Sequence, residues 1–167
     1  MSARALGLAA VLTLSAGALG GCGFTPLYAK PGVVAGLTAI QVNVPHGRTA
    51  FLIGEDLNDD LARDKDKPAT YRLDLTVMEK RYPRGLKLDN TADRYEAHVI
   101  VGYSLVEIDS GKVVKTGSEP IEISYAASGY PYAGIMAQQD AQKRAAEEAA
   151  RRISLDLGVY FANQSTQ

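Results

Sequence analysis

Cys22, the only cysteine in the 167-residue chain, directly follows Gly20 and Gly21 at the end of an apolar N-terminal stretch. Small residues let a peptidase hold the backbone closely, so the chemistry expected here is cleavage in front of the thiol. Arg4 supplies a positive charge ahead of the apolar run, which gives the three-part layout of a secretory signal peptide. The run is too short to span a bilayer comfortably. We therefore predict that residues 1–21 are a signal peptide and are removed.

The run Leu19-Gly20-Gly21-Cys22 resembles the lipobox of bacterial lipoproteins. The resemblance implies that Cys22 begins the mature chain and carries acyl lipid on its sulfur and on its new amino group. One acyl chain binds a membrane with a partition constant of only about 10⁴ M⁻¹, so several chains give stable anchoring. The alternative is an ordinary exported protein with a stray cysteine near its cleavage site. Residues 22–35 contain prolines and glycines and are predicted to form an extended, lipidated tether.

Four basic residues with apolar neighbours form a second candidate site. They are Lys80, Arg81, Arg84 and Lys87, and the residues interleaved with them are Tyr82, Pro83, Leu86 and Leu88. On one hairpin they would make a positively charged, amphipathic tip that suits the phosphates and acyl chains of a glycolipid. The alternative is a solvated hairpin with ordinary surface charges.

Motifs for catalysis and metal binding are not found in the sequence. There is no G-x-S-x-G, and Gly111-Lys112 lacks the remaining residues of a phosphate-binding loop. His46 and His98 are far apart, and His98 is interpreted as a solvated or packed strand residue rather than a ligand. Residues 56–60 match the start of a calcium loop, but Leu61 replaces the required glycine. The acidic side of a helix explains them better.

The composition is typical of one globular domain without a disulfide. About 146 residues would remain after cleavage, which suffices for a single core. The formal net charge is −1, with both signs mixed along the chain, so no nucleic-acid partner is expected. A lone cysteine cannot form an internal disulfide, so packing must hold the fold together.

The hydrophobic patterns predict a strand, a helix and a three-stranded meander. Residues 37–44 alternate as a strand, and a leucine-rich stripe favours a helix over residues 48–64. Alternation then predicts strands over residues 71–77, 94–108 and 113–125. Tyr82-Pro83-Arg84-Gly85 suits a turn, and residues 109–112 suit a hairpin turn. Pro120 indicates an edge strand or a bulge near Gly117–Pro120.

A long alanine-rich helix is predicted at the C-terminus. It would start with Pro131 and stop at Gly158, with small and aliphatic residues on one face: Ala141, Ala145, Ala149, Ile153 and Leu157. Three acid–base pairs at i,i+4 spacing would line its exposed face: Asp140–Arg144, Glu147–Arg151 and Glu148–Arg152. Residues 36–161 would form a single α+β domain, and residues 162–167 a disordered tail.

The residues after the cysteine carry a more specific resemblance. Cys22 followed by Gly-Phe-x-Pro-Leu-Tyr over residues 23–28 is similar to the start of the lipopolysaccharide-assembly lipoprotein family, LptE, in its alphaproteobacterial form. The order of elements is also similar. The resemblance implies two helices packed on one face of a four-stranded, largely antiparallel sheet. It further implies a place inside the outer-membrane β-barrel LptD, where the lipoprotein plugs the lumen, assists barrel assembly and handles lipopolysaccharide.

These observations lead to a hypothesis of a non-enzymatic lipoprotein on the periplasmic face of the outer membrane. Gly23, rather than Asp, after the lipidated cysteine agrees with the outer-membrane sorting seen in many lipoproteins. No cofactor other than covalent acyl lipid is expected. One alternative is an auxiliary lipoprotein of another periplasmic lipid-transport system. Another is a lipid-anchored enzyme, which the missing catalytic motifs disfavour.

Overall fold

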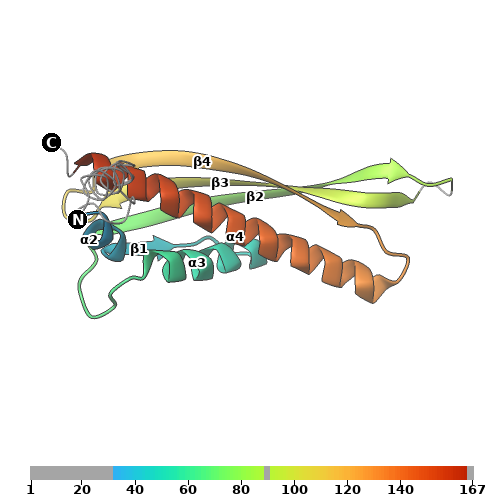
Figure 1. The fold of residues 1–167 in the computed structure, drawn as a ribbon, viewed down its shortest axis with the longest axis horizontal. Coiled ribbons are helices and arrows are strands. Elements are labelled where there is room, and N and C mark those ends of the chain that lie inside the picture. The colour runs from blue at the N-terminus through green and yellow to red at the C-terminus, as the bar shows by residue number, and fades with distance from the viewer. Residues whose placement is uncertain (1–31, 89–90, 165–167) are drawn as a thin grey trace, which may run out of the picture.

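The computed structural model describes residues 32–88 and 91–164, which form one sheet with helices on one face (Figure 1). The elements follow in the order α2 (Val33–Thr38), β1 (Ile40–Asn43), α3 (Arg48–Leu61), β2 (Tyr71–Leu86), β3 (Ala92–Glu107), β4 (Val113–Ala126) and α4 (Pro131–Gln164). Cys22, the predicted signal peptide and most of the predicted tether lie outside the described residues.

The four strands lie in the order β1-β2-β3-β4. β1 pairs with β2 in parallel, whereas β2–β3 and β3–β4 are antiparallel. The sheet is therefore mixed, which corrects the expectation of a largely antiparallel sheet. The parallel pair arises because α3 lies between β1 and β2 in the chain and reverses its direction, as in other strand–helix–strand units.

Strict alternation sorts the residues of β2 and β3 between the two faces of the sheet. Leu73, Leu75, Val99, Val101 and Leu105 are buried against the helices, as predicted. The residues between them, such as Met78 and Ile100, are exposed on the face that no described helix covers. The molecule thus has one covered and one open sheet face.

The alanine face of α4 is buried, as the sequence predicted. Ala141, Ala145, Ala149, Ile153 and Leu157 have no exposed surface. Side chains this small let α4 lie close to the sheet and to α3. Two of the three predicted ion pairs are present, Asp140–Arg144 and Glu148–Arg152. The third is wrong, because Arg151 pairs with Glu148 at i,i+3 and Glu147 faces Lys143.

The described residues contain three helices rather than the expected two. Helix α2 begins at Val33, inside the predicted extended tether, and delays the first strand until Ile40. Val33 and Leu37 of α2 are buried in the main core, which explains why so short a helix forms. Helix α3 ends at Leu61, three residues earlier than expected, with Ala62 in a left-handed conformation (φ 47°).

Helix α4 continues through Gly158, which the sequence marked as a stop, and ends at Gln164. The predicted disordered tail is therefore wrong for residues 162–164, while 165–167 lie outside the described residues. The physical reason is burial of Phe161, whose ring lies edge-on to Tyr71 at a centroid distance of 5.4 Å. Across residues 32–88 and 91–164, no helix combines the length and hydropathy needed to cross a bilayer.

β2 also continues through the predicted turn at Tyr82–Gly85 and ends at Leu86. The real reversal comes later, where the Lys87 N–H donates to the Thr91 carbonyl oxygen at 2.9 Å. Pairing to β4 ends at Arg94, so the β2–β3 hairpin projects beyond the end of β4 (Figure 1). β4 is an edge strand, as Pro120 indicated, but the register shift lies at Leu105/Val106 rather than near Pro120.

Candidate functional site

The projecting hairpin carries all four basic residues that the sequence singled out, but it divides them between its two sides. Lys80 and Arg84 alternate with the core-facing residues of β2 and therefore lie on the open face. Arg81 lies on the helix side, where its Nη1 donates to Gln138 Oε1 at 3.0 Å. Lys87 follows the end of β2. A single four-residue cluster is therefore not formed.

Arg94 of β3 adds to the positive charge of the open face. It is the cross-strand partner of Arg84, so two guanidinium groups lie on neighbouring strands at the same level of the hairpin. Like charges at directly opposed positions destabilise a hairpin unless something neutralises them. Glu96 does so for Arg84, whose Nε donates to Glu96 Oε2 at 2.6 Å. Within the described ranges, Lys80 and Arg94 have no carboxylate partner at ion-pair distance.

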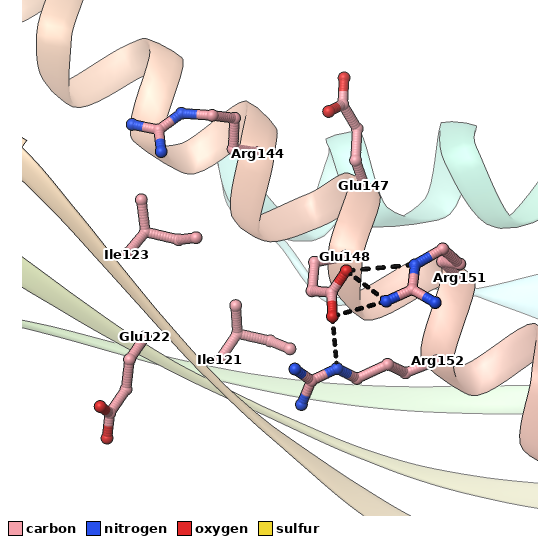
Figure 2. A pocket seen from close by; sticks show the side chains of 8 residues that line it. All are labelled: Ile121, Glu122, Ile123, Arg144, Glu147, Glu148, Arg151 and Arg152. Carbon is pink, nitrogen blue, oxygen red and sulfur yellow. Dashed lines mark hydrogen bonds and ion pairs between the residues drawn. The ribbon is translucent and has the colours of Figure 1, made fainter.

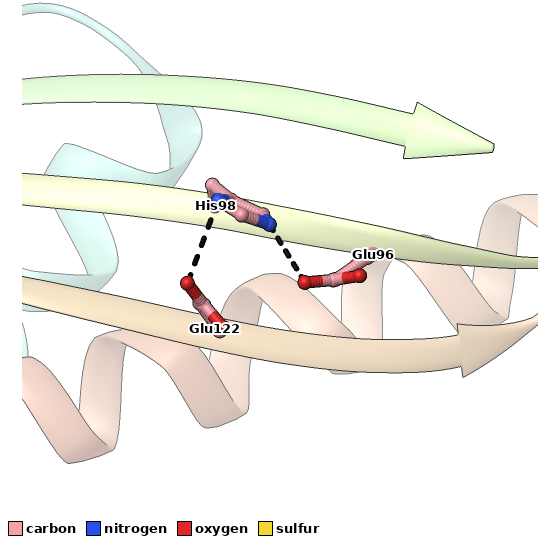
Figure 3. Close-up of side chains that lie close together, drawn as sticks. All are labelled: Glu96, His98 and Glu122. Atoms are coloured by element: carbon pink, nitrogen blue, oxygen red, sulfur yellow. Dashed lines mark hydrogen bonds and ion pairs between the residues drawn. The ribbon is translucent and has the colours of Figure 1, made fainter. Parts of the chain in front are cut away.

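His98 lies between two carboxylates on the same open face (Figure 3). Its Nε2 lies 2.7 Å from Glu96 Oε1, and its Nδ1 lies 3.7 Å from Glu122 Oε1. These three groups have the residue types of a small cation site. However, Glu96 already accepts a hydrogen bond from Arg84, which with His98 holds the pKa of Glu96 below its usual value. The cluster is accounted for as a charge network that joins β2, β3 and β4.

A cavity of about 560 Å³ lies between β4 and the middle of α4 (Figure 2). Glu148 accepts hydrogen bonds from Arg151 Nη2 and Arg152 Nε, both at 2.7 Å. These bonds hold the pKa of Glu148 below its usual value. Arg152 also donates to the Pro120 carbonyl oxygen at 3.3 Å and so ties α4 to the edge strand. The charges around this cavity mainly satisfy one another, which favours a structural role.

A third polar cluster connects β3, β4 and α4 near the other end of the sheet. The Tyr103 hydroxyl donates to Asp156 Oδ2, and Lys115 Nζ lies 2.9 Å from the same oxygen. Burial, followed by the bond to Asp156, raises the pKa of Tyr103. Burial alone would raise the pKa of Asp156, but the bonds from Tyr103 and Lys115 outweigh it and keep that pKa low. This cluster too is internally satisfied.

Comparison with models of protein families gives a match over most of the folded domain. The model of the family described as "LptE: Lipopolysaccharide-assembly" matches residues 37–157, well over half of the chain. The chain belongs to the LptE family. A search of curated protein sequences finds no match. The LptE family consists of non-enzymatic lipoproteins of lipopolysaccharide assembly, which agrees with the hypothesis drawn from Cys22–Tyr28.

Solved structures support the assignment. This LptE-family chain is 42% identical to a protein of Caulobacter crescentus described as a lipoprotein, with 80% of this chain and 97% of that chain covered and a TM-score of 0.69. Rare lipoprotein B of Shewanella oneidensis is 18% identical over 75% and 96% of the two chains, with a TM-score of 0.58. A minor lipoprotein of Acinetobacter baumannii is 10% identical over 72% and 89%, with a TM-score of 0.53. The last two show a shared fold only.

Proposed function

We propose that this protein is an outer-membrane lipoprotein of the lipopolysaccharide export complex, where it plugs an LptD-type β-barrel, assists its assembly and binds lipopolysaccharide. The match of the LptE family model over residues 37–157 carries this proposal. Cys22 would hold the lipid anchor at the periplasmic leaflet. The protein would act by occupying the lumen of the barrel and by binding lipopolysaccharide.

The projecting hairpin supports the lipopolysaccharide part of the proposal. Lys80, Arg84 and Arg94 lie on one face, and Lys87 lies at the end of the same hairpin. Arginine and lysine bind phosphate well, and Lys80 and Arg94, which have no carboxylate partner among the described residues, would gain from an anionic ligand. The exposed side chains of Tyr82 and Leu86 are apolar neighbours for acyl chains. The hairpin would compete for lipid A phosphates and keep the glycolipid dispersed.

Co-purification tests the barrel partner. The full lipidated chain, extracted from outer membranes with mild detergent, is expected to bring down a large β-barrel protein in a constant ratio. Absence of a barrel under these conditions would contradict the proposal. Recovery of a periplasmic carrier or an inner-membrane transporter in its place would favour the alternative, an auxiliary lipoprotein of another lipid-transport system.

Charge changes on the hairpin test the lipopolysaccharide site separately. Lys80→Glu, Arg84→Gln and Lys87→Glu combined are expected to weaken lipopolysaccharide binding about tenfold or more, equivalent to about 1.4 kcal/mol. Lys112→Glu, in the turn between β3 and β4 and away from the hairpin tip, is the control and should bind normally. Thermal melting of each variant checks the fold. Unchanged binding in the triple variant would show that these residues are ordinary surface charges and do not bind lipopolysaccharide.

A further inference from the structure

A groove of about 220 Å³ lies on the helix side of the hairpin, between the ends of β3 and β4 and the start of α4. Arg81, Tyr95, Tyr125, Ser128, Ile135 and Gln138 are among the residues that line it. Lys80 and Arg84 lie on the opposite side of the hairpin, so this groove is separate from the surface described above. The basic pattern in the sequence singled out Arg81, but neither it nor the family match indicates the groove or its other lining residues.

Arg81 is held in place in the groove without being neutralised. Its Nη1 donates to Gln138 Oε1, and its guanidinium carbon lies 4.6 Å from the centroid of the Tyr95 ring. Both contacts fix the orientation of the group and neither removes its charge. In the described part of the chain, no carboxylate lies within ion-pair distance of Arg81. Its other N–H groups can therefore bind an anion in the groove.

Tyr125 provides an independent indication of a ligand. The residue is only 8% exposed, and its hydroxyl has no hydrogen-bond partner among the described residues. An unsatisfied buried hydroxyl costs roughly 1–3 kcal/mol. Tyr103, a second buried tyrosine in the described part of the chain, has its hydroxyl satisfied by Asp156. Tyr125 lines the groove but its hydroxyl is buried, so an acceptor would remove this penalty by entering the groove deeply enough to reach the hydroxyl.

The N-terminus of α4 adds positive potential at the same place. The helix is 34 residues long and starts at Pro131, with no acidic residue in its first turn. The first N–H groups of a helix have no partner within it, and the helix dipole favours an anion there. Arg81, the Tyr125 hydroxyl and this helix end thus all favour an acceptor with negative charge.

Exposed apolar side chains lie at and just before the start of α4, and one of them, Ile135, lines the groove. Tyr130, just before α4, and Tyr132, in its first turn, are 80% and 75% exposed, and Ile135 and Met136 of α4 are also exposed. Exposed apolar groups beside a site for an anion fit a ligand with a charged head and a hydrocarbon chain. A soluble anion would make no use of them.

We propose that the groove binds the phosphate group of an anionic amphiphile, with Arg81 and Tyr125 donating to its oxygens and the start of α4 contacting its alkyl chain. The assignment of a phospholipid or a glycolipid as the natural molecule that carries this phosphate group rests on the proposed function. Free phosphate is the other source of the same chemistry, and the experiment separates the two.

The test uses the full lipidated chain in dodecyl maltoside and measures binding of monooctyl phosphate, inorganic phosphate and octyl glucoside by calorimetry. Monooctyl phosphate is expected to bind at least about tenfold more tightly than either of the others. If inorganic phosphate binds as tightly as monooctyl phosphate, the alkyl chain adds nothing and the ligand is not an amphiphile. If octyl glucoside binds as tightly, the negative charge adds nothing and the groove is not an anion site. No binding of monooctyl phosphate would overturn both.

Two variants assign the binding to the groove. Tyr125→Phe should weaken monooctyl phosphate binding about fivefold or more, and Arg81→Gln about tenfold or more. Tyr103→Phe and Lys80→Gln are the matched controls and should leave it unchanged. Because the Tyr125 hydroxyl has no hydrogen-bond partner within residues 32–88 and 91–164, Tyr125→Phe should not lower the melting temperature. Unchanged binding in Tyr125→Phe, or a lower melting temperature, would overturn the assignment.

Failure of this proposal is distinguishable from failure of the proposed function. If the groove variants bind monooctyl phosphate normally while the hairpin variants lose lipopolysaccharide, only the groove is wrong. If the wild-type chain binds monooctyl phosphate through the groove but recovers no barrel and no lipopolysaccharide, the proposed function is wrong and the groove stands.

Discussion

At the scale of single residues, Gly117 shows how one missing side chain makes room for a polar network. A Cβ at this position would overlap the hydroxyl and ring of Tyr103, with Cε1 only 2.6 Å away. Glycine therefore lets the Tyr103 ring lie across β4 and reach Asp156 on α4. The sequence marked Gly117 as an interruption of the strand. Its role is instead to admit an aromatic ring from the neighbouring strand.

We expect Gly117→Ala to lower the free energy of unfolding by about 1–3 kcal/mol, because the new methyl group must displace the Tyr103 ring. Urea unfolding at neutral pH measures the effect. Gly129→Ala is the control, since nothing lies within 4 Å of its added Cβ, and it should change stability by less than about 0.5 kcal/mol. Equal effects of the two substitutions would contradict this account.

Asp156 should make stability depend on pH. Its pKa in the folded chain lies below the ordinary value of 3.8, so its contribution is fully present above that value and is lost as the pH falls through the folded pKa. At neutral pH, Asp156→Asn is expected to cost about 1–2 kcal/mol, because Lys115 loses its partner. The difference from wild type in urea unfolding should shrink in acid. A difference independent of pH would contradict the assigned bonds.

The basic cluster illustrates what residue-level reasoning could and could not predict. The sequence identifies the four positions, but their spacing alone predicts one basic tip. The alternation of Leu73, Leu75 and Val77 continues along β2 and places Arg81 on the helix side. The sequence signal that separates it from Lys80 and Arg84 was therefore present. The groove was not predictable, because Tyr125 and the start of α4 meet Arg81 only in the folded chain.

At the scale of elements, periodicity predicted the strands β2–β4 and the buried alanine face of α4. These elements are long and obey one period throughout, so local pattern and tertiary environment agree. Helix α2 and the end of α4 were not predicted. Both depend on a mutual contact, in which the Phe161 ring packs where Gly36 has no side chain. A contact between residues so far apart in sequence leaves no local periodic signal.

This contact gives a prediction for the last turns of α4. Phe161→Ala should cost about 3–5 kcal/mol, because a buried aromatic side chain is replaced by a cavity. A chain ending at Gly158 should lose at least as much, whereas one ending at Gln164 should keep wild-type stability. Thermal melting compares the three. Wild-type stability of the chain ending at Gly158 would mean that residues 159–164 add nothing to the fold.

At the scale of the whole molecule, the helices cover one face of the sheet and leave the other open, while the hairpin extends past the end of β4 (Figure 1). The two proposed binding sites lie on opposite sides of this hairpin. One molecule could therefore bind one amphiphile on each side of the hairpin, or a single large glycolipid across its edge. The hairpin variants and the groove variants separate these possibilities, since losses in binding add only if the two sites act independently.

The last prediction concerns how the whole molecule reaches its membrane. Cys22→Ser should abolish acylation and remove the protein from the outer-membrane fraction, because serine offers no thiol for lipid attachment. The domain should still fold, since the described core begins at Val33, eleven residues after Cys22 in the chain. Membrane fractionation measures the first effect, and thermal melting of the purified soluble variant measures the second. An anchored Cys22→Ser protein would show that another segment holds the chain at the membrane.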